Sequence, residues 1–315
     1  MKEVQFSEVP DLQSAVLIGA FAGWNDAAAA ATWAIKFLIH QWDARPIAEI
    51  EPERFYDFTE TRPKVRVRQG ALKQVVWPSN RFYVHRAPRG DNGPLHRDIV
   101  LFLGTEPQLR WKTFCHRVVE VCRQCQVEEV ALLGALVADV PHTLPAPISG
   151  TSGETTTLRR MTKIGVEHAN YEGVSGILAV LQHVARKSGF STSSLWGAAP
   201  HYVSATPNLR VSQALLAKLN ALYEFDLRLD DLTDAVQGFT QRVSALVDMD
   251  PEVSAYVREL ERRNATNEIT GTTFAGDTSG VHRISASGDL PSPEQAIEDV
   301  EEFLRQFRTD GGTES

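Results

Sequence analysis

The chain has 315 residues, of which 43% are hydrophobic and 23% are charged. These fractions, together with 21 glycines and 16 prolines, are typical of globular domains and exclude a collagen-like or fully disordered chain. The net charge is −8, and residues 271–315 hold nine acids against three arginines. Because the rest of the chain is nearly neutral, it lacks the basic excess that nucleic-acid binding usually requires.

The hydropathy pattern predicts neither a signal peptide nor a membrane span, since no stretch reaches 18 uncharged apolar residues. Three cysteines in a chain without an export signal indicate reduced thiols in the cytoplasm. Cys122 and Cys125 form a C-x-x-C pair, a spacing that also occurs in redox and zinc sites. At helical spacing the pair shares an apolar face with Trp111 and Cys115, so we expect all three thiols to pack in the core.

Apolar segments and helical segments alternate along the first 200 residues. Four segments have the composition of buried parallel strands: residues 15–20, 99–103, 130–133 and 195–199. Three helices are predicted, at about residues 25–40, 108–126 and 175–187. The second of them follows Thr105-Glu106-Pro107-Gln108, which has the pattern of a capping box. This alternation predicts an α/β fold in which a mostly parallel sheet lies between helical layers.

Residues 53–98 interrupt this alternation. Four short strands are predicted there, at residues 54–58, 64–68, 73–77 and 81–86. The segment holds ten basic residues against five acids, so we interpret it as a β-hairpin insertion with a solvated or subunit-contacting face.

The chain after Pro207 has only helical patterns, at about residues 208–223, 230–247 and 251–264. We therefore expect three parts: an α/β core (1–207), a helical cap or lid (208–265) and a flexible acidic tail (266–315). A final helix is predicted in the tail at about 293–307. Its apolar side is formed by Ile297, Val300, Leu304 and Phe307.

Ligands of open α/β sheets bind beyond the carboxyl ends of the strands, and this rule selects four segments. They are residues 23–26, 104–106, 139–157 and 200–201. The ligand-binding candidates within them are Gly23, Asn25, Asp26, Gly104, Glu106, His142, Ser152 and His201. The catalytic candidates are His142 as a general base, with Glu154 and Asp26.

Each candidate also has a structural interpretation. Asp26 is either a helix cap or a catalytic or ligand-binding carboxylate, and Glu106 and Glu154 are either helix-start or loop carboxylates or substrate contacts. Ser152 with His142 would form a nucleophile and base, although the G-x-S-x-G elbow of hydrolases is absent. No nucleotide-binding glycine motif or metal-ligand spacing occurs, so neither a cofactor nor a metal is expected.

Four segments together resemble the proteasome assembly chaperone 2 family. They are residues 17–27 (LIGAFAGWNDA), 55–63 (FYDFTETRP), 103–107 (LGTEP) and 139–143 (DVPHT). The resemblance covers about residues 10–265, and the helical C-terminal extension is similar to that of the actinobacterial branch. It implies a three-layer core similar to phosphorylases and hydrolases, with the later helices as a cap over the strand ends. It also implies a homo-oligomer, for example a trimer, with the 53–98 hairpin as the contact element.

Two functions follow as hypotheses. The resemblance and the lack of a complete catalytic motif favour a chaperone-like binding or scaffolding protein with a ligand pocket at the strand ends, whose partner is another protein. The alternative is a small-molecule hydrolase or phosphorylase-like enzyme that uses the same pocket, so whether the protein is an enzyme stays open at this point.

Overall fold

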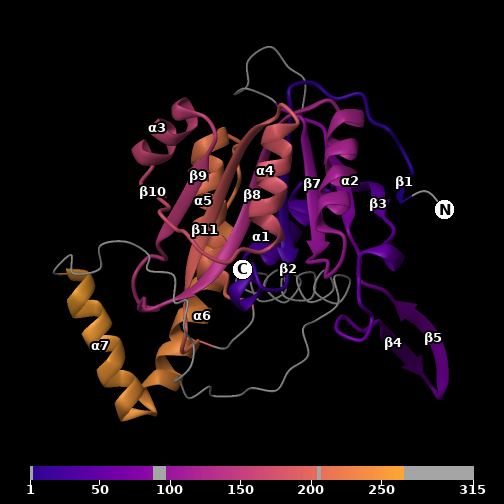
Figure 1. Ribbon diagram of the computed structural model, residues 1–315. Coiled ribbons are helices and arrows are strands. Elements are labelled where there is room, and N and C mark those ends of the chain that lie inside the picture. Colours follow the sequence, from indigo (N-terminus) through magenta and orange to yellow (C-terminus); the bar gives the residue numbers. More distant parts are fainter. Residues whose placement is uncertain (1–2, 88–96, 204–206, 266–315) are drawn as a thin grey trace, which may run out of the picture.

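A nine-stranded sheet forms the centre of the computed structural model, which describes residues 3–87, 97–203 and 207–265 (Figure 1). In spatial order the strands are β1 (Val4–Phe6), β3 (Arg45–Ile50), β6 (Arg81–His85), β7 (Ile99–Thr105), β2 (Ala15–Ala22), β8 (Val127–Ala138), β11 (Ser191–Pro200), β9 (Ile148–Ser152) and β10 (Glu167–His168). The four central strands β7, β2, β8 and β11 run parallel, whereas β6 and β9 pair antiparallel with their inner neighbours. The predicted mostly parallel sheet is confirmed.

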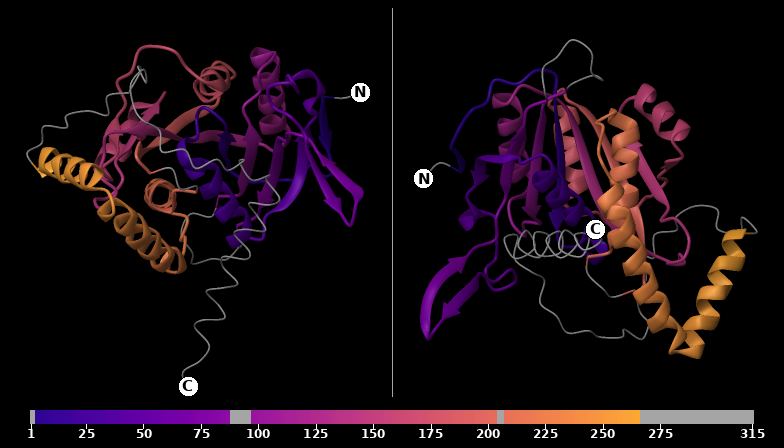
Figure 2. Two further views of the ribbon diagram at one scale, coloured as in Figure 1. Left: turned by 90° about the horizontal axis from the view of Figure 1, so that it is seen from below. Right: turned by 180° about the vertical axis from the view of Figure 1, so that it is seen from behind.

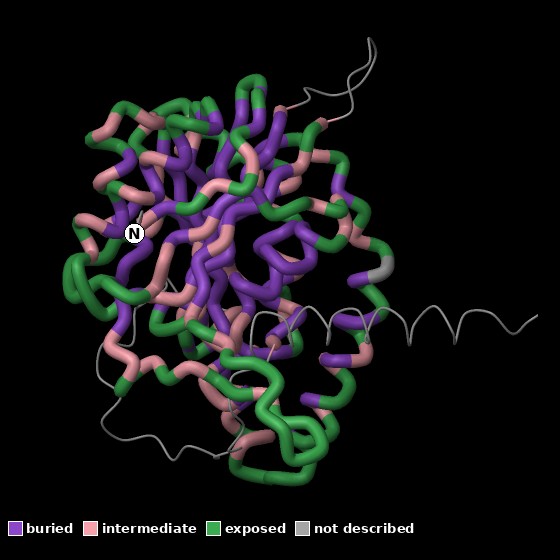
Figure 3. Tube along the Cα trace, turned by 90° about the vertical axis from the view of Figure 1, so that its right-hand side faces the viewer, coloured by how far each residue is buried: buried purple, intermediate pink, exposed green. Residues whose placement is uncertain are grey.

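Helices cover both faces of the sheet, which gives three layers (Figure 2). One layer contains α1 (Ala30–Gln41) and α5 (Leu209–Tyr223), and the other contains α2 (Trp111–Gln124) and α4 (Ile177–Lys187). Alternate residues of β2 enter the two cores, because successive strand side chains point to opposite faces. Ile18 packs with the α1 layer and Leu17 with the α2 layer. Burial on both faces explains why these strands appear in the sequence as continuous apolar segments (Figure 3).

Two parts project from the layers. The hairpin of β4 (Lys64–Arg68) and β5 (Ala71–Val76) extends away from the sheet, and its turn places Gln69 and Gly70 at φ values of 53° and 75° (Figure 1). The helices α6 (Asp230–Asp248) and α7 (Pro251–Ala265) form an arm below the carboxyl ends of the strands. The first half of α6 packs on α5 through Leu232, Val236 and Phe239. The helix α3 (Thr155–Lys163) lies beside β9 and β10.

Several elements differ from the sequence predictions. The strand predicted at 54–58 is wrong: a 3₁₀ turn (Pro52–Arg54) stands there, and the following Phe55 and Tyr56 are buried. The sheet uses β3 in its place, which the sequence analysis missed because this strand near the edge of the sheet carries Arg45 and Glu49. The short helical turn Ala27–Ala29 precedes α1.

Two helices have features that the sequence did not predict. The predicted capping box does not begin α2, which starts at Trp111 after Arg110 in a left-handed conformation (φ 55°). The helix α5, which lies within the expected cap (208–265), packs on α1 and β11. The predicted linker and final helix of the tail lie outside the described residues.

Candidate functional site

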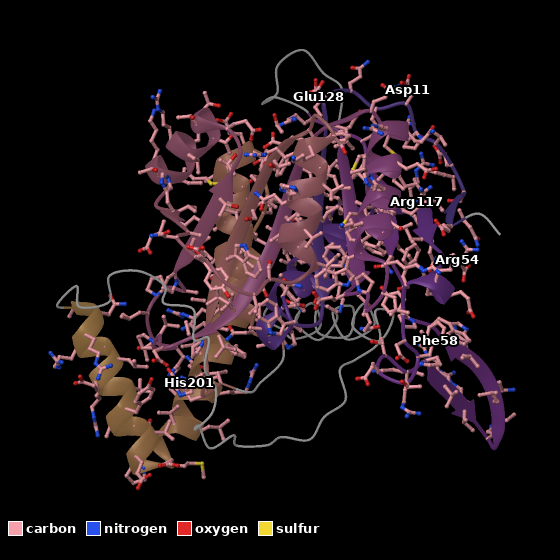
Figure 4. All side chains as sticks on the ribbon, viewed as in Figure 1. Asp11, Arg54, Phe58, Arg117, Glu128 and His201 are labelled. Carbon is pink, nitrogen blue, oxygen red and sulfur yellow. The ribbon has the colours of Figure 1, made fainter. Side chains whose placement is uncertain are left out.

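The carboxyl ends of the parallel strands β2, β7, β8 and β11 meet at one edge of the sheet. His201, just after β11, lies at this edge, whereas Glu128 at the start of β8 lies at the opposite end (Figure 4). Of the candidate residues, Gly23, Asn25, Asp26, Gly104, Glu106, His142 and His201 belong to segments at this edge. The structure arranges those with polar side chains in two separate clusters.

The first cluster is a clamp around the Glu106 carboxylate, which follows β7. Its Oε1 accepts hydrogen bonds from Asn25 Nδ2 (2.9 Å) and from the backbone N–H of Ile177 (2.8 Å), and its Oε2 accepts one from the backbone N–H of Trp24 (3.2 Å). Ile177 is the first residue of α4, so the charge lies where a helix N-terminus stabilises an anion. Glu106 is therefore a helix-start carboxylate, but for α4 and not for the helix that follows it in sequence.

Small residues allow the clamp to close. Gly23 has φ 128°, and a Cβ there would lie 3.1 Å from Glu106 Cβ. A Cβ on Gly176 would lie 2.3 Å from Asn25 Oδ1, a distance that real Cβ atoms do not show. Gly104 is equally constrained, because its Cβ would lie 2.5 Å from Asn80 Oδ1. Packing within the protein thus leaves no room for a side chain at Gly23 and Gly104, the two glycines among the ligand-binding candidates.

Asp26 belongs to the same loop and is buried. Its Oδ1 accepts a hydrogen bond from Ala31 N (2.7 Å), and its Oδ2 accepts one from Thr32 N (3.3 Å) and one from the Thr32 hydroxyl. Burial raises the pKa of Asp26 to about 6, against the lowering effect of these hydrogen bonds. These contacts are those of a cap on the first turn of α1.

The second cluster holds His142, which joins the loop after β8 to the arm. Its Nδ1 lies 2.9 Å from the Tyr202 hydroxyl, and its Nε2 lies 3.0 Å from the Ser244 hydroxyl on α6. The Tyr202 hydroxyl also accepts a hydrogen bond from the His142 backbone N–H (2.7 Å). Burial, and then the positive charge of Arg210, lower the pKa of His142, so its ring is neutral at pH 7. The cavity beside it measures about 10 Å³, which is about the space of one water molecule.

His201 lies next to this cluster, between two tyrosine rings. Its ring centroid is 5.6 Å from that of Tyr202 and 5.3 Å from that of Tyr256 on α7. Its Nδ1 lies 3.2 Å from Asp139 Oδ1. Burial, followed by the charge of Asp139, raises the pKa of Tyr256. His142 and His201 therefore share one aromatic cluster that contacts both helices of the arm.

Ser152 and Glu154 do not lie at this edge. The segment 139–157 is not a continuous loop but contains β9, which runs antiparallel to β11, so Ser152 pairs with Ser193 near the start of β11. Ser152 Oγ donates to the Thr192 carbonyl (2.8 Å), and Glu154 Oε2 accepts from Thr192 N (3.2 Å). The structure thus separates Ser152 from His142, and the proposed nucleophile and base do not meet.

The two clusters at the strand ends are also separate from each other. Within residues 3–87, 97–203 and 207–265, no hydrogen bond joins Asp26 or Glu106 to His142 or His201. Nor does any group of three or more histidine, cysteine, aspartate or glutamate side chains in these ranges form an arrangement that could hold a metal ion.

Four exposed apolar side chains lie on segments that form the Glu106 clamp or adjoin it, and the sequence analysis missed them. We call them the strand-end patch: Trp24, Val137, Tyr171 and Val174, which are 65%, 46%, 42% and 75% exposed. The segments that carry them meet at Asn25, which follows Trp24: its carbonyl accepts a hydrogen bond from Ala135 N (2.9 Å), two residues before Val137, and its side chain lies against Gly176, two residues after Val174. Their signal in the sequence was weak, because single apolar residues in loops are common.

The tyrosines and polar residues of the second cluster were also missed, since Tyr202, Ser244 and Tyr256 meet His142 and His201 only through tertiary packing. The three cysteines, in contrast, are buried and free as predicted. No helix in the described part of the chain combines the length and hydropathy needed to cross a lipid bilayer.

Comparisons with known proteins agree with this architecture. The model of the PAC2 family matches residues 20–247. A PAC2 family protein from Streptomyces avermitilis is 37% identical with a TM-score of 0.68, over 77% of this chain and 99% of the other. A proteasome-assembly chaperone homologue from Mycobacterium tuberculosis is 36% identical with a TM-score of 0.69, over 77% and 99% of the two chains.

An archaeal proteasome activator from Pyrococcus furiosus, PbaB, is 16% identical with a TM-score of 0.62 over 78% of this chain and 99% of its own, and it shares the fold. No curated protein matches the chain. The family match covers more than two thirds of the sequence and includes most of the residues that carried the resemblance. The chain belongs to the PAC2 family.

Proposed function

We propose that the protein is a binding or scaffolding protein of the proteasome-assembly-chaperone type, and that its partner docks on the strand-end patch. One observation carries this proposal. The polar side chains that an enzyme would use at this edge are bonded within the protein, while the apolar side chains of the strand-end patch are exposed. Exposed apolar side chains that gather in one place are typical of protein interfaces.

The relatives suggest the partner. The similar protein from Mycobacterium tuberculosis is described as a proteasome-assembly chaperone homologue, and the one from Pyrococcus furiosus as a proteasome activator. We therefore propose proteasome subunits as the partner of this protein. The enzyme alternative lacks support from the site, because about 10 Å³ beside His142 leaves no room for a substrate.

We also propose that copies of the protein associate, with the hairpin within residues 53–98 as a contact element and a trimer as one such assembly. Exposed charged side chains on the other side of the hairpin, at Lys64 and Arg68 of β4, support this proposal. A ligand pocket at the strand ends, formed by the candidate residues, stays a prediction.

The test is direct binding to purified proteasome α and β subunits of the same organism, followed by native mass spectrometry. The wild-type protein should form a complex with at least one subunit. Trp24→Ser and Val174→Asp should each weaken that complex by more than about tenfold, because an exposed anchor side chain at an interface often contributes about 2 kcal/mol.

A matched control is Val9→Asp, since Val9 is 53% exposed but lies in the N-terminal segment before β2. This variant should bind as the wild type does. Absence of binding to every subunit would overturn the proposed function, and equal binding by the patch variants would overturn the proposed surface.

A further inference from the structure

The hairpin has a largely exposed apolar face, on which the Trp77 ring contacts that of Phe58 (4.7 Å between centroids). In its register Val65 lies opposite Val75 and Val67 lies opposite Leu72, and opposite residues of an antiparallel pair share one face. We call this the hairpin face: Val65, Val67, Leu72, Val75 and Trp77, which are 60%, 57%, 60%, 40% and 46% exposed. A two-stranded ribbon that exposes its apolar face is marginally stable unless another segment packs on it.

Charge around the hairpin face is strongly polarised. From Thr61 to Asn80 the chain contains no acid and five basic residues: Arg62, Lys64, Arg66, Arg68 and Lys73. At the base of the hairpin the charge reverses. There a cleft of about 430 Å³ between β5 and the sheet edge is lined by Glu49, Glu51 and Glu53 together with Trp77 and Arg81, whose guanidinium lies 3.3 Å from the Glu49 carboxylate.

We propose that residues 293–308 of the same chain dock on the hairpin face. This segment lies outside the described residues, and its sequence matches the surface in three respects. Ile297, Val300, Leu304 and Phe307 recur at helical spacing and provide an apolar stripe for the exposed valines and Trp77.

The charges of the segment give the contact a direction. Its acids lie in the first part, at Glu294, Glu298, Asp299, Glu301 and Glu302. Its two basic residues, Arg305 and Arg308, follow at the end. Lys64, Arg66 and Arg68 alternate with Val65 and Val67, so they extend from the other side of the thin ribbon, at a distance comparable with the Debye length of about 8–10 Å. Their attraction places the acidic part along β4, and the arginines lie toward the glutamates of the cleft beside Trp77.

The connecting chain is long enough for this contact. Between Ala265, the end of α7, and Pro293 lie 27 residues, which reach about 90 Å when fully extended. A compact domain of this size has a diameter of roughly 47 Å. Tethering also gives the segment an effective concentration on the order of 1 mM, which favours it over a free partner at micromolar concentration.

Zero-length cross-linking of the full chain tests the proposal, because a carbodiimide joins a lysine amine to a carboxylate in contact with it. The acidic segment contains no lysine, so every link to it identifies the surface that it touches. We expect links from Lys73 to the Glu298–Glu302 region. Lys163 at the end of α3 and Lys187 at the end of α4 are matched control amines and should give none.

A second measurement uses substitutions in the segment, which leave the core intact. With an effective concentration of about 1 mM and a dissociation constant of about 0.1 mM, docking should slow amide hydrogen exchange in β4 and β5 about tenfold. Leu304→Asp with Phe307→Asp should remove this protection and the Lys73 links. When a mixture of ¹⁴N- and ¹⁵N-labelled protein is cross-linked, the two linked peptides should carry the same isotope, because the segment docks on its own chain.

The outcomes separate the possible occupants. Links that join the two isotopes would overturn docking within one chain and assign the face to a second copy. Absence of Lys73 links, or equal hydrogen exchange in the wild type and the double variant, would overturn the proposal outright. Neither result depends on proteasome binding at the strand-end patch.

Discussion

Asp26 was predicted as a candidate site residue, and in the structure its side chain contributes to the packing of the core. Its carboxylate is buried and bonded to the first turn of α1, so the capping interpretation describes its contacts. Its position at a loop start after β2 was visible in the sequence. The sequence could not predict the burial, because burial depends on the bridge that Asp26 forms with Ala135 of β8.

The raised pKa of Asp26 makes its contribution to stability depend on pH. In the folded state the pKa is about 6, against 3.8 for an unperturbed aspartate, so the folded state binds the proton more tightly. The stabilising effect of this proton is complete below pH 3.8 and is lost as the pH rises through 6. Between pH 4.5 and 7.5 the wild type should lose about 2 kcal/mol of unfolding free energy relative to Asp26→Asn, which does not titrate.

Urea denaturation of both proteins at the two pH values measures this difference. The comparison cancels the titration of all other groups, provided that the variant retains the cap through its amide oxygen. If the difference in unfolding free energy between the two proteins stayed constant with pH, the raised pKa of Asp26 would be contradicted.

Glu106 should be more important for stability than its partial exposure indicates. Glu106→Ala removes the acceptor for three N–H donors, and we expect a loss of about 3 kcal/mol in unfolding free energy. Glu106→Gln keeps one carbonyl oxygen and should lose less. Glu128→Ala is the control, because Glu128 is 62% exposed and its nearest cation, Arg97, is 3.9 Å away. Equal stability of the Glu106→Ala and Glu128→Ala proteins would rule out the clamp.

This clamp was beyond sequence analysis. Glu106 and Ile177 are 71 residues apart, and only the fold brings the end of β7 to the start of α4. The pattern around Glu106 is that of a capping box, which predicted the correct kind of contact at the wrong helix.

At the scale of elements, the hydrophobic pattern of the sequence predicted the strands and helices whose buried faces produce that pattern. The central strands appear as continuous apolar segments because both of their faces are covered, and α2 has an apolar stripe because it covers the sheet on one side. The short strand β9 was missed within its segment, since Ile148–Ser152 contains three small or polar residues at its centre and no alternation. This omission placed Ser152 and Glu154 at the wrong edge.

The apolar face of α2 gives a prediction for the cysteines. Burial raises the pKa of Cys115 to about 12 and that of Cys125 to about 11, and it raises the pKa of Cys122 further. Because the thiolate is the reactive form, none of the three should react with a thiol-specific reagent in the native protein. All three should react after denaturation. Rapid modification of one thiol under native conditions would contradict the packing of this face.

The arm of α6 and α7 should respond to pH through His142. The groups that face this ring are Tyr202, Ser244 and the charged side chains of Arg210, Asp248 and Glu261. Because the folded pKa of His142 is lowered from 6.5, the neutral ring stabilises docking of the arm above pH 6.5. This stabilisation is lost as the pH falls below that value and then through the folded pKa.

Hydrogen exchange of residues 230–265, corrected for intrinsic rates and referenced to α2, measures this effect. Exchange in the arm should increase several-fold between pH 7 and pH 5.5 in the wild type. In His142→Gln, which cannot titrate, the increase should be absent. The same pH response in both proteins would show that other groups hold the arm.

At the scale of the whole molecule, most of the candidate residues predicted to meet at the strand ends lie there, but Ser152 and Glu154 do not. The sequence correctly predicted an α/β core and a family, because both depend on local patterns that repeat along the chain. It predicted one pocket for the candidate residues, and this pocket stays a prediction; in the structure their polar side chains at the strand ends form two separate clusters. The difference lies in which side chains bond to each other, and tertiary packing alone decides this.

Hydrogen exchange of the complex with a proteasome subunit tests whether the partner docks on the strand-end patch. We expect binding to slow exchange at residues 23–27 and 171–177, on both sides of the Glu106 clamp, while the β9 edge with Ser152 and Glu154 is unaffected. Protection confined to that opposite edge, or unchanged exchange around Trp24 and Val174 in a demonstrated complex, would contradict it.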